Sequence, residues 1–278
     1  IRLGVIGDMG QTSDSIKTMY KVIDTLKTRQ SLDQLLLLGD LSYADGYGPR
    51  WDTYGRMVEP LFGQIPSAVI GGNHEFEKGE SWVGLRARWP MPPLESSADG
   101  GQARPLYYSY EVGPVHVLAL CSYMASSPSS ALYQFVKADL RSVDRTVTPW
   151  LIVIMHVPWY TSNQNHGMGE GAATRMALEP LIARARVDLV LTGHVHAYER
   201  TVPVRNLQRT SRCEGGVTHI TIGDGGNREG QALPWNEPQP KWSAVRQAAF
   251  GFGVLQIHNA TTARWEWWRD DDDEGREG

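Results

Sequence analysis

Cysteine is scarce in this chain of 278 residues, which contains only Cys121 and Cys213. A metal site built from thiolates is therefore excluded, and a bound metal would have to use histidine, carboxylate, amide or phenol ligands. The two cysteines could pair or remain as buried thiols, because their spacing does not decide between these states. A chain of this length can bury a substantial core, so its folding does not depend on a disulfide.

Excess positive charge and long apolar runs are also lacking. The formal net charge is −4, which excludes a broad basic face for nucleic acid. No apolar run is long enough for a transmembrane helix, and we find no signal peptide. The chain starts at Ile1 within a strand pattern, so we expect that it was processed or trimmed. We expect no nucleic-acid partner and no membrane contact. An anionic substrate would need local positive charge, for which bound metal is the usual source.

Apolar runs alternate with helical patterns over most of the chain. Continuous runs predict buried strands at residues 1–6, 35–38, 67–70, 115–120, 151–155 and 187–191. Helical spacing predicts helices over residues 13–30, after Ser130 and before residue 187. This alternation indicates an α/β fold. Short strands expected at 219–222, 252–258 and 263–268 indicate a mixed sheet or two packed sheets. We expect one domain over residues 1–269 and a charged, disordered tail over 270–278.

Polar residues follow five of the predicted strands at the point where each strand ends. The five clusters are Gly7-Asp8-Met9-Gly10, Gly39-Asp40-Leu41-Ser42-Tyr43, Gly71-Gly72-Asn73-His74-Glu75, His156, and Gly193-His194-Val195-His196. Functional groups of open α/β sheets gather beyond the carboxyl ends of the strands, so the five clusters should converge. We expect the glycines before Asp8, Asp40 and His194 to let the backbone turn tightly as it leaves the strand.

Together these clusters offer more metal ligands than one ion can use. The candidate donors are Asp8, Asp40, Tyr43, Asn73, His156, His194 and His196. Their number suits two ions that share a bridging carboxylate, and their chemistry favours iron, zinc or manganese over magnesium or calcium. Taken singly, Gly-Asp and Asn73 are ordinary turn residues and Tyr43 an ordinary packed aromatic. Their order, each after an apolar run, favours the metal interpretation.

The same motifs resemble those of the purple acid phosphatases, members of the calcineurin-like metallophosphoesterases. The likeness covers nearly the whole chain and includes Asp8-x-Gly10, Gly39-Asp40-x-x-Tyr43, Gly72-Asn73-His74-Glu75, His156 and Gly193-His194-x-His196. Glu199-Arg200 and residues 223–229 and 238–243 resemble the plant-type, high-molecular-weight branch. Tyr43 discriminates best, because the wider superfamily usually lacks a tyrosine at this position.

The resemblance implies a fold, a metal centre and an activity. The fold would be a β-sandwich of two mixed sheets flanked by helices. Fe(3+) would be bound by Asp8, Tyr43 and His196, a divalent Zn, Mn or Fe ion by Asn73, His156 and His194, and Asp40 would bridge the two. The implied enzyme is an acid phosphatase that hydrolyses phosphate monoesters, with phytate among the candidate substrates. Its nucleophile would be a metal-bound hydroxide, which two adjacent cations generate while they neutralise the phosphate oxygens.

Two histidines outside the donor set are candidate catalytic residues. His74 follows Asn73, so it should face the metals without binding them. We expect it to hold the phosphoryl group or protonate the leaving oxygen, the alternative being that it only orients a ligand. Plant-type relatives often have two adjacent histidines near the fourth block, whereas this chain has Asn165-His166. His166 is therefore the candidate for the remaining substrate contact. These relatives also carry an N-terminal fibronectin-like domain, and this chain begins at the first catalytic strand.

Two other functions are alternatives. One is a phosphodiesterase or nucleotide pyrophosphatase of the same superfamily, against which Tyr43 argues. The other is a non-catalytic metal-binding scaffold, against which the complete donor set argues. Arg200 and Arg228 could contact substrate or form structural ion pairs. We expect packing or surface roles for His116, His219 and His258 and for the tryptophan-rich end, Trp265, Trp267 and Trp268.

Location and partners are predicted from weaker features. Asn259-Ala260-Thr261 is a glycosylation sequon, which favours a glycoprotein. The family is mostly secreted or vacuolar, so the resemblance implies secretion, the cell wall or the vacuole. The expected partner is a small phosphorylated substrate. A homodimer remains an alternative to a monomer.

Overall fold

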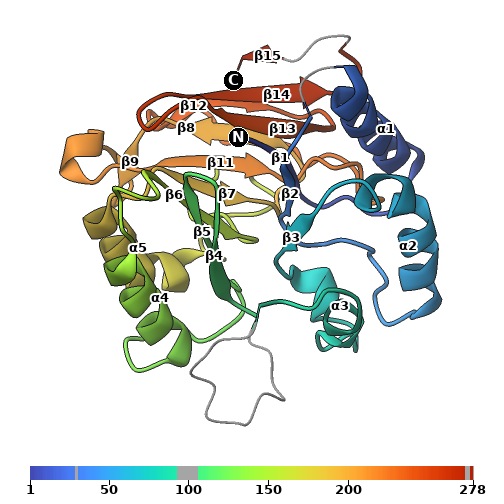
Figure 1. The fold of residues 1–278 in the computed structure, drawn as a ribbon, viewed down its shortest axis with the longest axis horizontal. Helices are drawn as coiled ribbons and strands as arrows, with labels where there is room; N and C mark the ends of the chain where they lie inside the picture. Colours follow the sequence, from blue (N-terminus) through green and yellow to red (C-terminus); the bar gives the residue numbers. More distant parts are fainter. Residues whose placement is uncertain (29–30, 93–105, 273–275, 278) are drawn as a thin grey trace.

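Two β-sheets packed face to face form the centre of the molecule, with helices on both outer sides (Figure 1). The computed structural model describes residues 1–28, 31–92, 106–272 and 276–277. In Figure 1, α1, α2 and α3 lie on one side of the sheets and α4 and α5 on the other. The helices are α1 (Ser13–Thr28), α2 (Pro49–Phe62), α3 (Val83–Arg88), α4 (Ala131–Ser142) and α5 (Ala172–Ala185).

The first sheet has six strands in the order β15-β14-β13-β1-β2-β3. Its parallel half is β1 (Arg2–Ile6), β2 (Gln34–Leu37) and β3 (Ser67–Val69). Its antiparallel half is β13 (Gly251–Ile257), β14 (Ala263–Arg269) and β15 (Arg276–Glu277). The early strands of the chain thus pair with the late ones, which closes the fold.

The second sheet has seven strands in the order β12-β8-β11-β7-β6-β5-β4. The four inner strands run parallel: β5 (Val115–Ala119), β6 (Trp150–Met155), β7 (Leu189–Thr192) and β11 (Thr218–Ile222). Antiparallel strands flank them: β4 (Tyr108–Val112), β8 (Tyr198–Thr201) and β12 (Ser243–Gln247). A short ribbon of β9 (Val204–Arg205) and β10 (Gln208–Arg209) lies outside both sheets.

Alternate residues of β6 show why the predicted runs are apolar throughout. Ile152 and Ile154 belong to the core between the two sheets, whereas Leu151 and Val153 belong to the core under α4 and α5. A strand covered on both faces needs apolar side chains on both. The predicted fold, two mixed sheets flanked by helices, is therefore confirmed.

The buried face of α1 differs in part from the apolar stripe that the sequence predicts. The helical spacing of the sequence predicts a stripe of Ile16, Met19, Tyr20, Ile23 and Leu26, but Ile16 and Tyr20 are 40% and 54% exposed. Met19, Ile23 and Leu26 of the predicted stripe do pack on the core, and Val22 joins them there. A surface helix buries only part of its circumference, so apolar residues at the margin of the stripe stay in water. Residues 29–30 of the predicted helix lie outside the described part of the chain.

The start of the predicted tail packs against the fold instead of extending into solvent. Thr18 of α1 donates a hydrogen bond of 2.8 Å to the Asp270 carboxylate, and Lys21 donates to the carbonyl oxygens of Arg269 and Asp272. The acidic residues after β14 thus meet donors on α1, and β15 adds an edge strand. Residues 273–275 and 278 lie outside the described part.

Two further sequence questions are answered by the structure. Cys121 is buried and Cys213 is exposed, and both are free thiols. Among the described residues, no helix has the length and apolar character needed to cross a membrane.

Candidate metal centre

Both sheets point the carboxyl ends of their parallel strands at one place, where the predicted ligands meet. The ligands follow their strands directly: Asp8 after β1, Asp40 and Tyr43 after β2, Asn73 after β3, His156 after β6, and His194 and His196 after β7. Backbone hydrogen bonds hold neighbouring loops together, from Asp8 N–H to the Gly39 carbonyl (3.1 Å) and from Gly193 N–H to the His156 carbonyl (3.0 Å). The expected convergence of the five clusters is therefore observed.

The glycines that precede the ligands do not all act as predicted. Gly39 alone of the three has a left-handed backbone, with φ +88°. A Cβ on Gly7 would lie 2.6 Å from the carbonyl oxygen of Ile222, and one on Gly193 would overlap the Asp8 carboxylate. Gly7 and Gly193 are therefore required because other groups approach closely, and the turn itself is made by the residues that follow.

Asp8, Tyr43 and His196 form one half of the site. The Tyr43 phenol oxygen lies 3.1 Å from Nε2 of His196, and this nitrogen lies 3.4 Å from Oδ1 of Asp8. Oδ2 of Asp8 accepts the His194 backbone N–H at 2.8 Å, whereas Oδ1 is buried and has no hydrogen-bond partner among the described residues. A buried carboxylate oxygen without a donor is costly, and a cation at this point would satisfy it.

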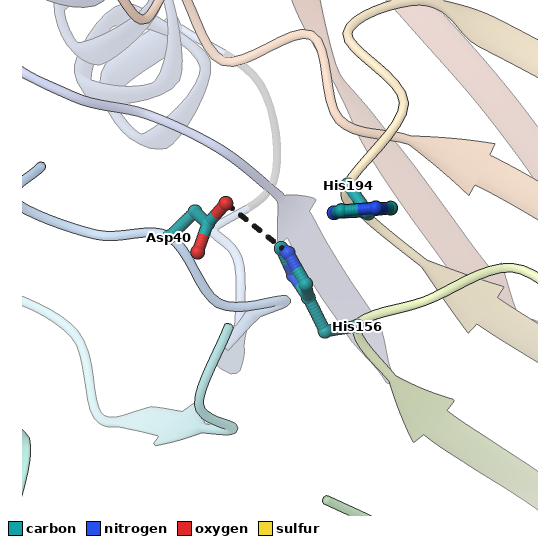
Figure 2. A group of neighbouring side chains, drawn as sticks. All are labelled: Asp40, His156 and His194. Carbon is teal, nitrogen blue, oxygen red and sulfur yellow. Dashed lines mark ion pairs between the residues drawn. The ribbon is translucent and has the colours of Figure 1, made fainter. Parts of the chain in front are cut away.

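Asn73, His156 and His194 form the other half, with Asp40 beside them. Oδ1 of Asn73 lies 3.3 Å from Nε2 of His156 and 3.1 Å from Nδ1 of His194. Figure 2 shows Asp40 and His156 facing each other, with Oδ2 of Asp40 3.2 Å from Nε2 of His156 and His194 alongside. Ligand atoms of Asp40, His156 and His194 all lie within 4.8 Å of one another, so one ion could contact all three.

Backbone carbonyls orient two of the imidazoles. Nδ1 of His156 donates to the Leu38 carbonyl at 2.6 Å, and Nδ1 of His196 donates to the Gly230 carbonyl at 3.1 Å. Each bond fixes a proton on Nδ1 and turns Nε2 toward the site, where a cation could take the place of any proton on it. This is the arrangement that a metal-binding imidazole requires.

The charges of the site also fit a cation. Burial would raise the pKa of Asp40, but the charge and hydrogen bond of His156 and the nearby His74 hold it well below its usual value. Burial would lower the pKa of His156, but Asp40 and Asp8 raise it to about 10. Burial and the charges of Asp8 and Asp40 raise the pKa of Tyr43 well above its usual value. Ionised carboxylates in a buried cluster need positive charge, and Tyr43 could ionise only beside a cation.

His74 lies beside the donor set, between two further carboxylates. Its Nδ1 is 2.5 Å from Oδ1 of Asp45, and its Nε2 is 3.4 Å from Oε1 of Glu229. Burial would lower the pKa of His74, but Glu229, Asp40 and Asp45 raise it to about 9. Its Nε2 is also 4.0 Å from Oδ2 of Asp40. These carboxylates therefore favour the protonated form of His74 at the edge of the site.

His166 lies at the rim, next to a ligand. Its ring centroid is 4.4 Å from that of His194, and its Nδ1 is 3.4 Å from Oε1 of Glu170. The other oxygen of Glu170 lies 2.6 Å from Nε2 of His194. Hydrogen bonds from His166 and His194 lower the pKa of Glu170 to about 2. The structure thus brings His166 to the site together with a carboxylate that the sequence did not single out.

Glu75 is another residue whose role the sequence did not indicate. It is fully buried, and its carboxylate accepts the backbone N–H groups of Asp40 (2.8 Å), Leu41 (2.9 Å) and Gly72 (2.9 Å). It therefore ties the loop after β2 to the loop after β3. Glu75 and Glu229 lie in motifs that resemble the family, Gly72-Asn73-His74-Glu75 and residues 223–229, but no role was predicted for either, and Asp45 and Glu170 gave no sequence signal.

The remaining candidate histidines lie away from the donor set. His116 pairs with Asp139 at 3.0 Å, His219 packs its ring 4.7 Å from that of Tyr160, and His258 is exposed. Arg228 pairs with Asp45 and donates to the Tyr43 carbonyl at 2.8 Å. The histidines thus have the packing and surface positions that the sequence predicts.

Comparison with protein families agrees with this geometry. Residues 1–198 match the family model described as calcineurin-like phosphoesterase, and residues 216–276 match the one described as iron/zinc purple acid phosphatase-like protein C. The family match and the sheet sandwich, with candidate metal ligands at the strand ends, therefore define a metallophosphoesterase. More closely, the chain belongs to the purple acid phosphatase family.

Individual relatives support the assignment. The chain is 47% identical to purple acid phosphatase 18 of Arabidopsis thaliana and 38% identical to phosphoenolpyruvate phosphatase of Allium cepa, with 99% and 97% of the chain aligned. It spans 61% and 58% of the length of these relatives. The structure of a purple acid phosphatase from yellow lupin seeds superposes with a TM-score of 0.88 at 26% identity, covering 99% of this chain and 52% of the lupin chain.

Proposed function

We propose that this chain is the catalytic region of a metal-dependent acid phosphatase that hydrolyses phosphate monoesters. One observation carries the proposal: carboxylate, phenol, amide and imidazole donors from five separate loops converge in one buried cluster. Within this cluster the buried Oδ1 of Asp8 accepts no hydrogen bond from any described residue. Such a cluster would be costly to bury without cations, and two adjacent cations are suited to phosphate esters.

The donor set divides between two ions. Asp8, Tyr43 and His196 would hold Fe(3+), Asn73, His156 and His194 would hold a divalent Zn, Mn or Fe ion, and Asp40 would contact both. The contacts of Tyr43 and Asp8 with His196, and of Asn73 with His156 and His194, support this division. When bound, the ions would supply positive charge to the phosphate oxygens and lower the pKa of a bound water.

His74 and His166 would act on the substrate from the edges of the cluster. Asp45 and Glu229 hold the His74 ring in place, so its Nε2 proton can be donated to a phosphoryl oxygen or to the leaving oxygen. His166 is half-buried beside His194 and would contact the phosphoryl group from the rim. The carboxylate of Glu170 fixes the orientation of His166.

Secretion or a vacuolar location, with glycosylation at Asn259, completes the proposal. Asn259 and Thr261 are exposed, which a glycosylation site requires. The relatives that carry purple acid phosphatase names come from plants. An enzyme with its optimum on the acid side suits such compartments. Its partner would be a small phosphorylated substrate, phytate among them.

Hydrolysis of a monoester and a bis-ester at pH 5 and pH 8 tests the proposed activity. We expect the metal-loaded protein to prefer p-nitrophenyl phosphate over bis-p-nitrophenyl phosphate and to work faster at pH 5. A preference for the bis-ester with a maximum at pH 8 would instead favour a phosphodiesterase. A protein that binds metal but hydrolyses neither ester would be a scaffold.

A further inference from the structure

A second polar cavity lies beside the candidate metal centre and shares only Tyr43 with it. Its volume is about 320 Å³, and it is lined by Gln11, Ser42, Tyr43, Arg50, Thr53 and Arg228. The loop after β1, the loop after β2, the first half of α2 and the loop after β11 contribute these residues. A cavity of this size suits a small ligand or one end of a larger one.

Two guanidinium groups converge in this cavity, and of the two only Arg228 pairs with a carboxylate among the described residues. Nη1 of Arg228 lies 2.8 Å from the Tyr43 carbonyl oxygen, and Nη1 of Arg50 lies 3.4 Å from the same oxygen. A carbonyl oxygen is uncharged overall, so it does not offset the repulsion between the two cations. Within the part of the chain that the structure describes, Arg50 forms no ion pair, and its other acceptor is the Ala44 carbonyl at 3.4 Å.

Asp45, the carboxylate beside the cavity, already contacts several cationic side chains. Asp45 pairs with Arg228, lies 3.4 Å from Nζ of Lys78 and accepts from His74. Asp45 thus faces Arg228 and Lys78 as well as His74, which Glu229 also contacts, and the described lining of the cavity holds two arginines and no carboxylate. Ser42 adds a neutral donor: its hydroxyl is buried and accepts from the Ala44 N–H at 3.2 Å, but it donates to none of the described residues.

Tyr43 connects this cavity to the metal centre. Its phenol oxygen faces His196 in the centre, whereas its carbonyl oxygen faces the two arginines. The Arg228 guanidinium lies 5.7 Å from the Tyr43 ring centroid, and the adjacent Glu229 reaches His74. A substrate whose ester phosphate lies at the metals could therefore extend past Arg228 to Arg50.

We propose that this cavity is an anion subsite that binds a carboxylate or a second phosphate of the substrate. The preferred substrates are then phosphate monoesters that carry a second anionic group on the leaving side. Guanidinium groups recognise both anions through paired N–H donors, and Arg50 is the group left free to do so. The inference rests on the proposed phosphatase function and adds the substrate class to it.

A series of synthetic esters tests the subsite. The probes are phosphate monoesters of ω-hydroxy acids with increasing chain length, each compared with its neutral amide, and alkanediol bisphosphates of matched length. We expect the metal-loaded protein to favour the acid or the bisphosphate over the amide once the chain is long enough to reach Arg50. Arg50→Gln should lower this ratio of kcat/KM about tenfold or more, mainly through KM, because a charge-assisted hydrogen bond is lost.

Matched variants distinguish anion binding at the subsite from a general effect of positive charge on the protein surface. Arg56→Gln removes an exposed positive charge from the same helix and should leave the ratio unchanged. Arg50→Lys keeps the charge and should retain part of the preference. Equal kcat/KM for acid, bisphosphate and amide at every chain length would overturn the subsite while leaving the phosphatase function intact.

A binding measurement distinguishes failure of the subsite from failure of the proposed function. If the protein hydrolyses no phosphate monoester, the phosphatase function fails. Calorimetry with non-hydrolysable phosphonate analogues of the same acids and amides still tests the cavity. Tighter binding of the acids that is lost in Arg50→Gln supports the subsite, and equal binding of acids and amides overturns it.

Discussion

Left-handed backbone occurs at several of the candidate ligands themselves. Asp8, Asp40 and His194 have φ values of +56°, +50° and +67°. Residues with a Cβ seldom adopt this conformation, which costs of order 1–3 kcal/mol each and persists only where the surroundings enforce it. Here the backbone N–H groups of all three are held, by the Gly39 carbonyl, Glu75 and Asp8 respectively. The strain turns the side chains away from their strands and into a common cluster.

His74 should affect turnover more than binding. We expect His74→Asn to keep both metals and to lower kcat by about 10²–10⁴-fold with a smaller change in KM, because proton donation is needed mainly in the transition state. Steady-state kinetics and metal analysis of the same sample measure both effects. Loss of metal in this variant would instead make His74 a ligand or an orienting residue.

Glu75 should stabilise the connection between the loops after β2 and β3. Glu75→Gln replaces one acceptor oxygen by an amide nitrogen, so at least one of three buried N–H groups loses its partner. We expect the free energy of unfolding to fall by about 2 kcal/mol, the order of cost for a buried unsatisfied donor. Denaturant unfolding measures this loss, and Glu59→Gln on the exposed face of α2 is the control. Equal stability of the two variants would contradict the role of Glu75.

His219 in β11 should make the fold less stable in acid. Burial lowers the pKa of His219 to about 3, so the folded state keeps the ring neutral. Between pH 6.5 and pH 3 the unfolded state binds the extra proton, and stability is therefore complete above pH 6.5 and falls as the pH decreases. From pH 7 to pH 5 the loss from this residue is about 2 kcal/mol.

His219→Phe removes this titration and keeps an aromatic ring beside Tyr160. Denaturant unfolding at pH 7 and pH 5 should show a shallower decrease in stability for this variant than for the unaltered chain. His258→Gln, at an exposed position, should leave the decrease as it was. The account of His219 is wrong if the phenylalanine variant loses as much stability as the unaltered chain.

The sequence predicted buried strands better than edge strands and polar helices. β1, β5 and β6 are continuous apolar runs because they are covered on both faces, so their pattern was clear. β8 and β12 are short and largely polar (YERT and SAVRQ), and they gave no such signal. α2 was missed although Trp51, Tyr54, Val58 and Leu61 form a buried stripe, because it contains Pro60 and follows a loop rich in turn residues.

For the site, the sequence predicted the donors but not their supports. Each donor lies within a few residues of the end of an apolar run, so its position could be inferred from local pattern alone. Glu75, Asp45 and Glu170 contact donors or His74 from other loops. Their roles depend on how these loops approach one another in three dimensions, which spacing along the chain does not encode.

At the scale of the whole molecule, both sheets contribute side chains to the candidate metal centre. The first sheet supplies both carboxylates, the phenol and the amide, and the second supplies all three candidate imidazole ligands. Neither sheet carries a complete donor set for two ions. Metal binding should therefore stabilise the packing of one sheet on the other, in addition to its part in catalysis.

Metal content of the active protein tests the central claim most directly. We predict two transition-metal ions per chain by elemental analysis, with a visible absorption band from Tyr43 on ferric iron that Tyr43→Phe abolishes. Asp40→Asn should weaken the binding of both ions, because in the proposed division its carboxylate, which lies 3.2 Å from Nε2 of His156, contacts both. Fully active protein that holds a single ion, or none, would contradict the account.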